Sequence, residues 1–199
     1  MSRDLPCSGA CLRNAEPILG VLRRHFADRI RVLEIGSGTG QHAEYFATKL
    51  PHLTWQASDR DEYLPGIGLR LERAGLPNTP APLPFDVNDD EWPPGVYDAV
   101  FSANTLHIMS WSDVEHLFGG LPSLLAAEAT VAVYGPFNYG GRFTSPSNAA
   151  FDVSLKATAP HRGIRDSEAV NALAENSGLH LVDDISMPAN NRCLVWRRS

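Results

Sequence analysis

The sequence predicts an α/β fold built on one mostly parallel sheet, and three observations support this prediction. Short β-rich runs alternate with helical stretches along the chain, as stacked βαβ units require. Residues 31–49 show the alternation most clearly, because a strand pattern leads through a glycine loop into a helix pattern. Two β-rich runs, 179–185 and 192–197, close the chain as an expected antiparallel pair. A chain of 199 residues fills one core well, so we expect a single domain over residues 1–199.

The first half of the chain is expected to alternate helices and strands. Pro17 suits the first turn of a helix, and Pro51 ends the helix that follows the glycine loop. Prolines in residues 81–87 place the third strand at an edge of the sheet or make it irregular. In chain order we expect a helix over 17–26, a strand over 31–35, a helix over 41–49, a strand over 53–57, a helix over 61–74 and a strand over 81–87.

The second half continues the alternation. Residues 97–102 are the clearest strand, and residues 130–134 are the fifth. Ser112, with Glu115 three residues later, predicts a capping box at the start of a helix that runs to about residue 127. Gly178 ends a further helix over 167–176.

Residues 135–166 break this rhythm, because a plain connection is usually shorter than about 15 residues. We expect a short helix over 147–157 inside this segment, with Phe151 and Leu155 facing inward. Such an insertion is typical of a lid or a substrate-binding segment.

Composition and charge exclude several classes of partner. Hydrophobic residues make up 43% and charged residues 20% of the chain, which is typical of a globular protein. The formal net charge is −6 and the Lys and Arg residues are scattered, so we expect no nucleic-acid partner. No apolar run approaches the roughly 18 residues that span a bilayer, and the N-terminus lacks the apolar region of a signal peptide, so we expect no membrane partner.

The cysteines point to the cytoplasm. Cys7, Cys11 and Cys193 are an odd, sparse set, which fits reduced thiols. Cys7 and Cys11 have no nearby His or Cys that would complete a metal site, so we expect no metal.

The glycine loop is the first candidate binding site. Glycines allow a tight turn and let a ligand approach the main chain, although a turn without a ligand is an open alternative. A dinucleotide site needs the spacing G-x-G-x-x-G, whereas Gly36, Gly38 and Gly40 have the spacing G-x-G-x-G. Glu34, two residues before the first glycine, suits an ammonium group such as that of S-adenosylmethionine and suits a pyrophosphate poorly. We therefore expect this loop, including Ser37, to bind S-adenosylmethionine.

Two further acidic residues follow expected strands. Asp59, at the end of the second strand, can accept hydrogen bonds from both hydroxyls of a ribose, although it can also be a solvated turn residue. Asp86 and Val87, at the end of the third strand, could contact the adenine amine and ring. A simple turn role for Asp86 is nearly as well supported.

Asn104 and His107 follow the fourth strand, at the edge where open α/β folds place their ligands. His107 could act as a general base, since an unperturbed imidazole titrates near neutrality. It could equally line the site and only orient the methyl acceptor, because in-line geometry is the first requirement of methyl transfer.

Motifs along almost the whole chain resemble the methyltransferase-like protein 26 family. They are Arg13-Asn14, LEIGSGTGQHAEYFA, WQASD, NTLHI, YGPFN, SNAAFD, GIRD and MPANN. The resemblance implies a Rossmann-like class I methyltransferase fold, with a seven-stranded, mostly parallel sheet and an antiparallel last strand. It implies S-adenosylmethionine as cofactor, and it adds Asn14 to the cofactor-binding residues.

The resemblance also marks polar positions in or facing residues 135–166. We expect Tyr134, Asn138, Asn148, Asp152 and Asn191 to bind substrate, since a small-molecule site is an apolar pocket with a few fixed polar groups. The alternative is that these residues only stabilise turns.

Together these observations predict an enzyme that transfers a methyl group from S-adenosylmethionine to an O, N or S atom of a small molecule. The protein is expected to be a monomer or a homodimer. The alternative is a catalytically silent module that keeps the fold for cofactor binding or protein interaction. A nicotinamide-dependent oxidoreductase fits neither the glycine spacing nor Glu34.

Overall fold

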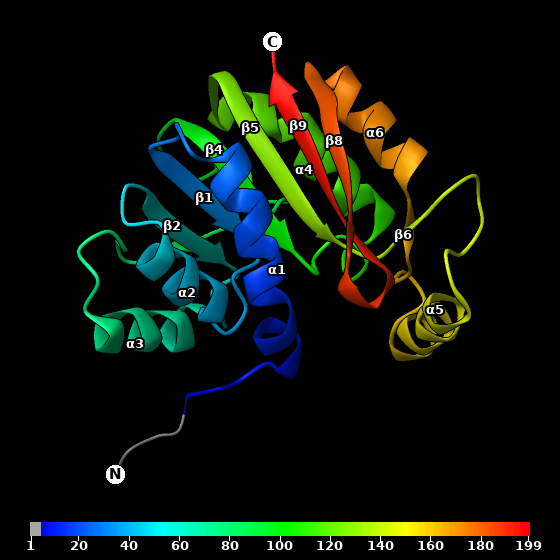
Figure 1. The fold of residues 1–199 in the computed structure, drawn as a ribbon, viewed down its shortest axis with the longest axis horizontal. Coiled ribbons are helices and arrows are strands. Elements are labelled where there is room, and N and C mark those ends of the chain that lie inside the picture. Colours follow the sequence, from blue (N-terminus) through cyan, green and yellow to red (C-terminus); the bar gives the residue numbers. More distant parts are fainter. Residues whose placement is uncertain (1–4) are drawn as a thin grey trace.

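A seven-stranded sheet runs through the centre of the molecule, and the computed structural model describes it within residues 5–199 (Figure 1). The strand order is β3-β2-β1-β4-β5-β9-β8. The strands are β1 (Arg31–Ile35), β2 (Thr54–Asp59), β3 (Leu83–Pro84), β4 (Tyr97–Ala103), β5 (Leu125–Gly135), β8 (Leu179–Met187) and β9 (Asn191–Arg198). A separate two-stranded sheet joins β6 (Phe137–Asn138) and β7 (Arg165–Asp166).

The strand directions bring the ends of several strands to one edge. β1 pairs in parallel with β2 and β4, β4 with β5, and β2 with β3, so the carboxyl ends of these strands share one edge. β9 pairs antiparallel with both β5 and β8. Because Gly135 pairs with Arg192, the tip of the β8–β9 hairpin also lies at the carboxyl edge. The expected antiparallel closing pair is thus confirmed.

Helices cover both faces of the sheet and give each face its own apolar core (Figure 1). On one face lie α1 (Gly9–His25), α2 (Gln41–Lys49) and α3 (Leu64–Ala74), around the fully buried Trp55. On the other lie α4 (Trp111–Leu124) and α6 (Ser167–Asn176), around the fully buried Trp196. α5 (Pro146–Thr158) stands beside the carboxyl edge, within residues 135–166.

Several expected elements differ in extent from the observed ones. For example, α4 ends at Leu124 and β5 begins at Leu125, whereas the helix was expected to run to about residue 127 and the strand to begin at residue 130. α1 begins at Gly9 and contains Pro17, because a proline removes only one hydrogen bond of the helix. The third strand spans only Leu83–Pro84, since the prolines of residues 80–84 cannot donate to a neighbouring strand.

Two expected local contacts are wrong. The capping box of α4 uses Ser110 and Asp113, two residues before the expected Ser112 and Glu115. Phe151 on α5 is 41% exposed, because the buried face of this helix carries the polar Asn148 and Asp152 beside Leu155.

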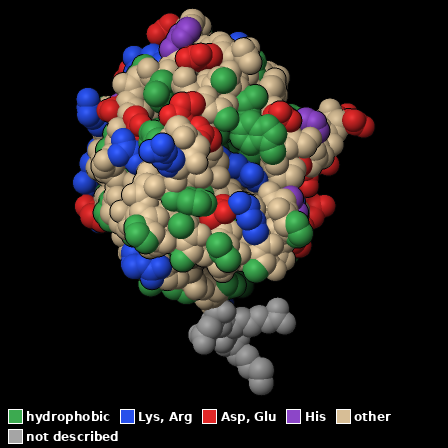
Figure 2. Space-filling view, turned by 90° about the vertical axis from the view of Figure 1, so that its right-hand side faces the viewer, with side chains coloured by type: hydrophobic (Ala, Val, Ile, Leu, Met, Phe, Trp, Pro, Cys, Tyr) green, Lys and Arg blue, Asp and Glu red, His purple; other side chains and the backbone are tan. Residues whose placement is uncertain are grey.

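The surface mixes charges of both signs. Figure 2 shows the side of the molecule that carries α5, α6 and β8, and its Lys and Arg side chains alternate with Asp and Glu without forming a continuous stripe. In the part of the chain that the structure describes, no helix is long and apolar enough to cross a membrane. Within residues 5–199 no group of three His, Cys, Asp or Glu side chains is arranged to hold a metal ion.

Candidate cofactor and acceptor site

The glycine turn after β1 is held by backbone hydrogen bonds to β2. The amides of Gly36 and Ser37 donate to the carbonyl of Ser58 over 3.1 and 3.0 Å. Gly36, Gly38 and Gly40 have φ values of 76°, 56° and 72°, a region that side chains with a Cβ rarely adopt. The turn therefore needs glycine for its backbone conformation.

Gly36 and Gly38 differ in how much free space surrounds them. A Cβ added at Gly36 would lie 2.9 Å from Thr105 Oγ1, so this glycine allows the turn to pack against the segment after β4. A Cβ added at Gly38 would meet no atom within 4 Å. The turn is thus packed against Thr105 at Gly36 and open at Gly38. The open space at Gly38 leaves room for a ligand to approach the backbone.

Glu34 is a buried carboxyl group next to this turn. It is 2% exposed, and its Oε2 accepts a hydrogen bond from Trp55 Nε1 over 2.8 Å. Burial raises the pKa of Glu34 to about 7, although the hydrogen bonds from Trp55 and Ser37 oppose this rise. A cationic ligand group beside this carboxylate would stabilise its charged form.

Asp59, at the end of β2, binds the same turn from the other side. Its Oδ2 accepts from the Gly38 amide over 2.6 Å, and its Oδ1 accepts from the Arg60 amide over 2.8 Å. Burial raises the pKa of Asp59. A carboxylate has about four acceptor positions, so Asp59 can hold the turn and still accept hydrogen bonds from ligand hydroxyls.

An arginine that the sequence pattern did not indicate ties three segments together at this site. Arg70 on α3 donates to the carbonyl of Thr39 in the glycine loop over 2.7 Å and to the carbonyl of Pro6 over 2.6 Å. It also forms an ion pair with Glu44 on α2 at 2.9 Å. Arg70 thereby holds the N-terminal segment against the glycine loop.

A polar cluster between α1, α2 and β5 contains a second residue that the sequence did not indicate, His42 on α2. His42 Nε2 lies 2.8 Å from Asn14 Oδ1, and burial lowers the pKa of His42 to about 4, so its imidazole is neutral. Asn14 and Asn191 also hydrogen-bond Tyr134, and burial raises the pKa of this tyrosine. The structure thus brings the expected cofactor residue Asn14 together with the expected substrate residues Tyr134 and Asn191.

The remaining expected cofactor residues lie after β3 and β4. Asp86 Oδ1 accepts from the Asn88 amide over 3.0 Å, which is a turn contact, and Val87 packs against the core that contains α4. Asn104 has a φ of 60° and donates its amide to the carbonyl of Tyr134 over 2.8 Å. Strained backbone of this kind is often found at binding sites.

His107 is buried between the sheet edge and the insertion. Its ring lies edge-on to the Phe151 ring, with 5.4 Å between the ring centroids. The amide of Gly163 donates to the His107 carbonyl over 3.1 Å. Burial lowers the pKa of His107 to about 4, and the positive charges of Arg165 and Arg162 lower it further. The imidazole is therefore neutral near pH 7, and its surroundings disfavour the imidazolium that a general base becomes.

Three expected substrate residues hold the insertion together. Asp152 accepts from the Ile164 amide over 2.8 Å and from Lys156 Nζ over 2.6 Å. Asn148 donates to the carbonyl of Asn190 over 3.0 Å, which links α5 to the β8–β9 hairpin. Asn138 donates to the carbonyl of Ile164 over 3.4 Å, next to the β6–β7 pair.

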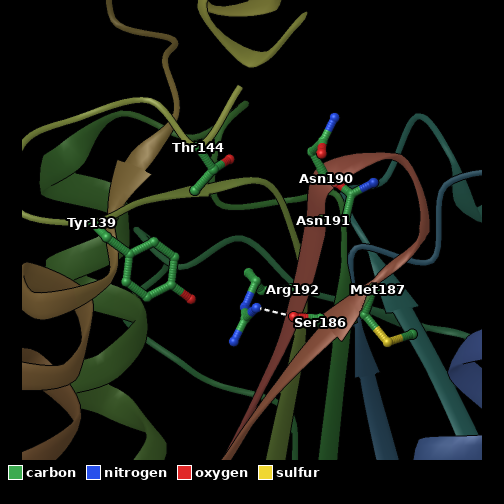
Figure 3. Close-up of a pocket in the computed structure, with 7 residues that line it drawn as sticks. All are labelled: Tyr139, Thr144, Ser186, Met187, Asn190, Asn191 and Arg192. Atoms are coloured by element: carbon green, nitrogen blue, oxygen red, sulfur yellow. Dashed lines mark hydrogen bonds between the residues drawn. The ribbon is translucent and has the colours of Figure 1, made fainter. Parts of the chain in front are cut away.

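A pocket of about 530 Å³ lies between the insertion and the β8–β9 hairpin. Figure 3 shows Tyr139 and Thr144 on the insertion side and the remaining lining residues on the hairpin. Of the five expected substrate residues, Asn191 lines this pocket. The other lining residues are Tyr139, Thr144, Ser186, Met187, Asn190 and Arg192.

Solved structures with the same fold include methyltransferases. An O-methyltransferase family protein from Burkholderia thailandensis is 17% identical, with a TM-score of 0.81 over 96% of this chain and 57% of that chain. The S-adenosylmethionine-dependent methyltransferase SibL is 23% identical, with a TM-score of 0.80 over 95% of this chain and 55% of that chain. Human N-acetylserotonin methyltransferase, solved with S-adenosylmethionine, is 14% identical, with a TM-score of 0.79 over 96% of this chain and 53% of that chain.

These likenesses show the fold, and the chain spans a little over half the length of the solved structures named above. The fold is that of the Rossmann-like methyltransferases, with a mostly parallel sheet and an antiparallel last strand. Within that class, the chain belongs to the family described as protein of unknown function (DUF938), whose model matches residues 5–198.

Proposed function

We propose that this protein binds S-adenosylmethionine at the glycine turn and transfers its methyl group to an O, N or S atom of a small-molecule acceptor. The observation that carries the proposal is the pair of carboxyl groups beside the glycine turn at the carboxyl edge: Glu34, buried in β1, and Asp59, which ends β2 and binds the Gly38 amide. The resemblance of the motifs to the methyltransferase-like protein 26 family supports the same activity.

The residues of the turn fit the parts of this cofactor. The Glu34 carboxylate would hold the ammonium group, whose positive charge offsets the cost of ionising a buried acid. Asp59 would accept the ribose hydroxyls, while the open backbone at Gly38 allows close approach. Asp86 and Val87 would contact the adenine. The remaining contacts are proposed for Asn14, Gly36, Ser37, Gly40 and Asn104.

When bound, S-adenosylmethionine supplies an electrophilic methyl group on a sulfonium sulfur. The task of the protein is to align an acceptor lone pair behind that methyl group, so that the bond to carbon forms as the carbon–sulfur bond breaks. We assign His107 to orienting the acceptor, because a buried neutral imidazole can hydrogen-bond, while its burial and the positive charges of Arg165 and Arg162 oppose its protonation. The acceptor proton then passes to solvent.

Residues 135–166 are proposed to cover the acceptor. The Asn148 side chain on α5 donates to the carbonyl of Asn190 in the β8–β9 hairpin, and the amide of Gly163 donates to the carbonyl of His107. Residues 1–199 would act as one methyltransferase domain in the cytoplasm, as a monomer or homodimer without nucleic acid or membrane partners.

Isothermal titration calorimetry with S-adenosylmethionine, S-adenosylhomocysteine and NAD tests the proposed cofactor. Both adenosyl compounds should bind and NAD should not; NAD binding without a response to S-adenosylmethionine would overturn the proposal. A protein that binds the cofactor and transfers no radioactive methyl group to any of a broad set of small acceptors would be the catalytically silent module instead.

A further inference from the structure

The pocket between the insertion and the β8–β9 hairpin has walls fixed by hydrogen bonds. Asn190 at the hairpin tip accepts from Asn148 through its carbonyl over 3.0 Å and donates from its side chain to Ser147 Oγ over 3.1 Å. Ala189 and Asn190 both have positive φ values, 57° and 58°. Backbone strain of this kind persists only where the surroundings hold it, and here the bonds from Asn190 to the insertion hold the hairpin tip.

Two lining residues of this pocket, Thr144 and Ser186, carry hydroxyl groups that can donate hydrogen bonds to a ligand. Thr144 Oγ1 accepts a hydrogen bond from Asn148 Nδ2 over 2.9 Å, and Ser186 Oγ accepts one from Arg192 Nη1. A hydroxyl carries one proton and two acceptor positions. Neither hydroxyl donates to another group in residues 5–199, so both protons are available to a ligand.

Arg192 adds a fixed cation to the same wall. Its guanidinium donates to Asp184 Oδ1 over 2.8 Å and to the carbonyl of Asp184 over 2.9 Å, and its Cζ lies 5.5 Å from the centre of the Tyr139 ring. Tyr139 also donates its hydroxyl to Asp184, over 2.9 Å. These contacts and the bond to Ser186 fix the position of the Arg192 side chain. At least one of its five N–H groups has no partner among these contacts and can bond a ligand.

The residues that line the pocket offer hydrogen-bond donors and include no acidic side chain. Its lining contains Arg192 as its charged residue and no Asp or Glu. Asp184, which is not among the lining residues, is bound to Arg192 and Tyr139, so its negative charge is already paired with the Arg192 guanidinium. A donor set of two hydroxyls and a guanidinium N–H matches the oxygens of a carboxylate.

We propose that this pocket binds the carboxylate of a small organic acid and that this acid is the methyl acceptor. The inference rests on the proposed methyltransferase function. Arg192 pairs with Gly135 in the sheet, and a Cβ at Gly135 would lie 3.8 Å from His107 Nδ1. An acid held by Arg192 would thus extend along the carboxyl edge toward His107 and the glycine turn.

Nuclear magnetic resonance titrations of the whole protein test the inference, with and without saturating S-adenosylhomocysteine. The probes are benzoate, 4-hydroxybenzoate and nicotinate, each compared with its primary amide. The carboxylates should shift the amide signals of residues 139–144 and 186–192, and each amide should bind at least about tenfold more weakly. Ser186→Ala should weaken carboxylate binding by about tenfold, and Thr144→Val with Ser186→Ala should weaken it further, whereas Ser123→Ala on α4 should not.

The outcomes separate the two proposals. Carboxylates that shift none of these signals, amides that bind as tightly, or unchanged binding in the double variant would each overturn the inference. If S-adenosylhomocysteine shifts the signals of residues 36–40 in the same sample, the failure concerns the acceptor alone. If S-adenosylhomocysteine fails to bind, the proposed function fails, while the titrations without it still decide whether the pocket selects carboxylates.

Discussion

The two ends of the carboxyl edge are built in different ways. The glycine turn is held by backbone amides of Gly36, Ser37 and Gly38, which bond to β2 next to it in the sheet. The insertion and the tip of the β8–β9 hairpin are linked to each other through side chains from segments far apart in the chain, such as Asn148 with Asn190. Backbone bonds form with the sheet itself, whereas each side-chain bond contributes only about 1 kcal/mol. The glycine turn is therefore held by the sheet next to it, whereas the contact between the insertion and the hairpin tip depends on single side-chain bonds.

The largest expected effect is at Gly36. Gly36→Ala combines a positive φ with a contact at 2.9 Å to Thr105, so we expect it to lower the free energy of unfolding by about 3 kcal/mol. Gly38→Ala, the matched control, has the positive φ without the contact and should cost about 1 kcal/mol. Urea denaturation measures both, and equal losses would contradict a turn that is packed on one side and open on the other.

Asp59→Ala comes next and tests the second carboxylate. We expect S-adenosylhomocysteine to bind more weakly by about 1.5–3 kcal/mol, the usual range for a hydrogen bond to a charged group. Asp61→Ala, an exposed carboxylate two residues later, is the control and should leave the affinity unchanged. Calorimetry measures the affinity of each variant for S-adenosylhomocysteine. An unchanged affinity in Asp59→Ala would show that Asp59 does not contact the cofactor.

A smaller effect is expected at the acceptor end. Tyr139→Phe removes the hydrogen bond to Asp184 and should make residues 139–144 open more readily by about 1 kcal/mol. Hydrogen exchange of these amides should then speed up by about fivefold, while residues 36–40 exchange as before. Tyr45→Phe on α2 is the matched control, and faster exchange across the whole chain would show that the two ends are not independent.

The smallest effect is expected for His107→Asn. Because the pKa of His107 is lowered to about 4, its imidazole is neutral across the physiological range, and an amide can replace its hydrogen bond. Turnover should therefore fall far less than the about 10²- to 10⁴-fold that loss of a general base causes. His107→Ala should raise KM more than it lowers kcat. A loss of the full size in His107→Asn would instead make His107 the base.

Local patterns in the sequence were sufficient for the framework and for the glycine turn. The strand over 31–35 and the helices over 41–49 and 167–176 were predicted to the residue, because each depends on neighbours in the chain. Glu34 in the first strand and Asp59 at the end of the second were placed correctly for the same reason, whereas the pairing of these two strands is seen only in the structure.

Contacts between distant segments could not be predicted in this way. Arg70 binds Pro6 and Thr39 across gaps of 64 and 31 residues, and no spacing pattern marks such contacts. The bonds of Asn148 to Asn190 and of Asp152 to Ile164 were not indicated by the sequence either, and substrate binding by these two residues stays a prediction. The capping box was misplaced by two residues, because Ser110 and Ser112 are both followed three residues later by an acid.

The most direct test of the cofactor site is the affinity for S-adenosylhomocysteine from about pH 5.5 to about pH 7.5, where the ligand ammonium group keeps its proton. Since burial raises the pKa of Glu34 to about 7, its carboxyl group is protonated at the acid end and charged at the other. The affinity of the wild-type protein should rise with pH and level off above about pH 7. Glu34→Gln should bind weakly at every pH, and 5′-methylthioadenosine, which has no ammonium group, should show no such rise. A flat profile in the wild-type protein, or a Glu34→Gln variant that binds as tightly, would contradict the assignment of Glu34 to the ammonium group.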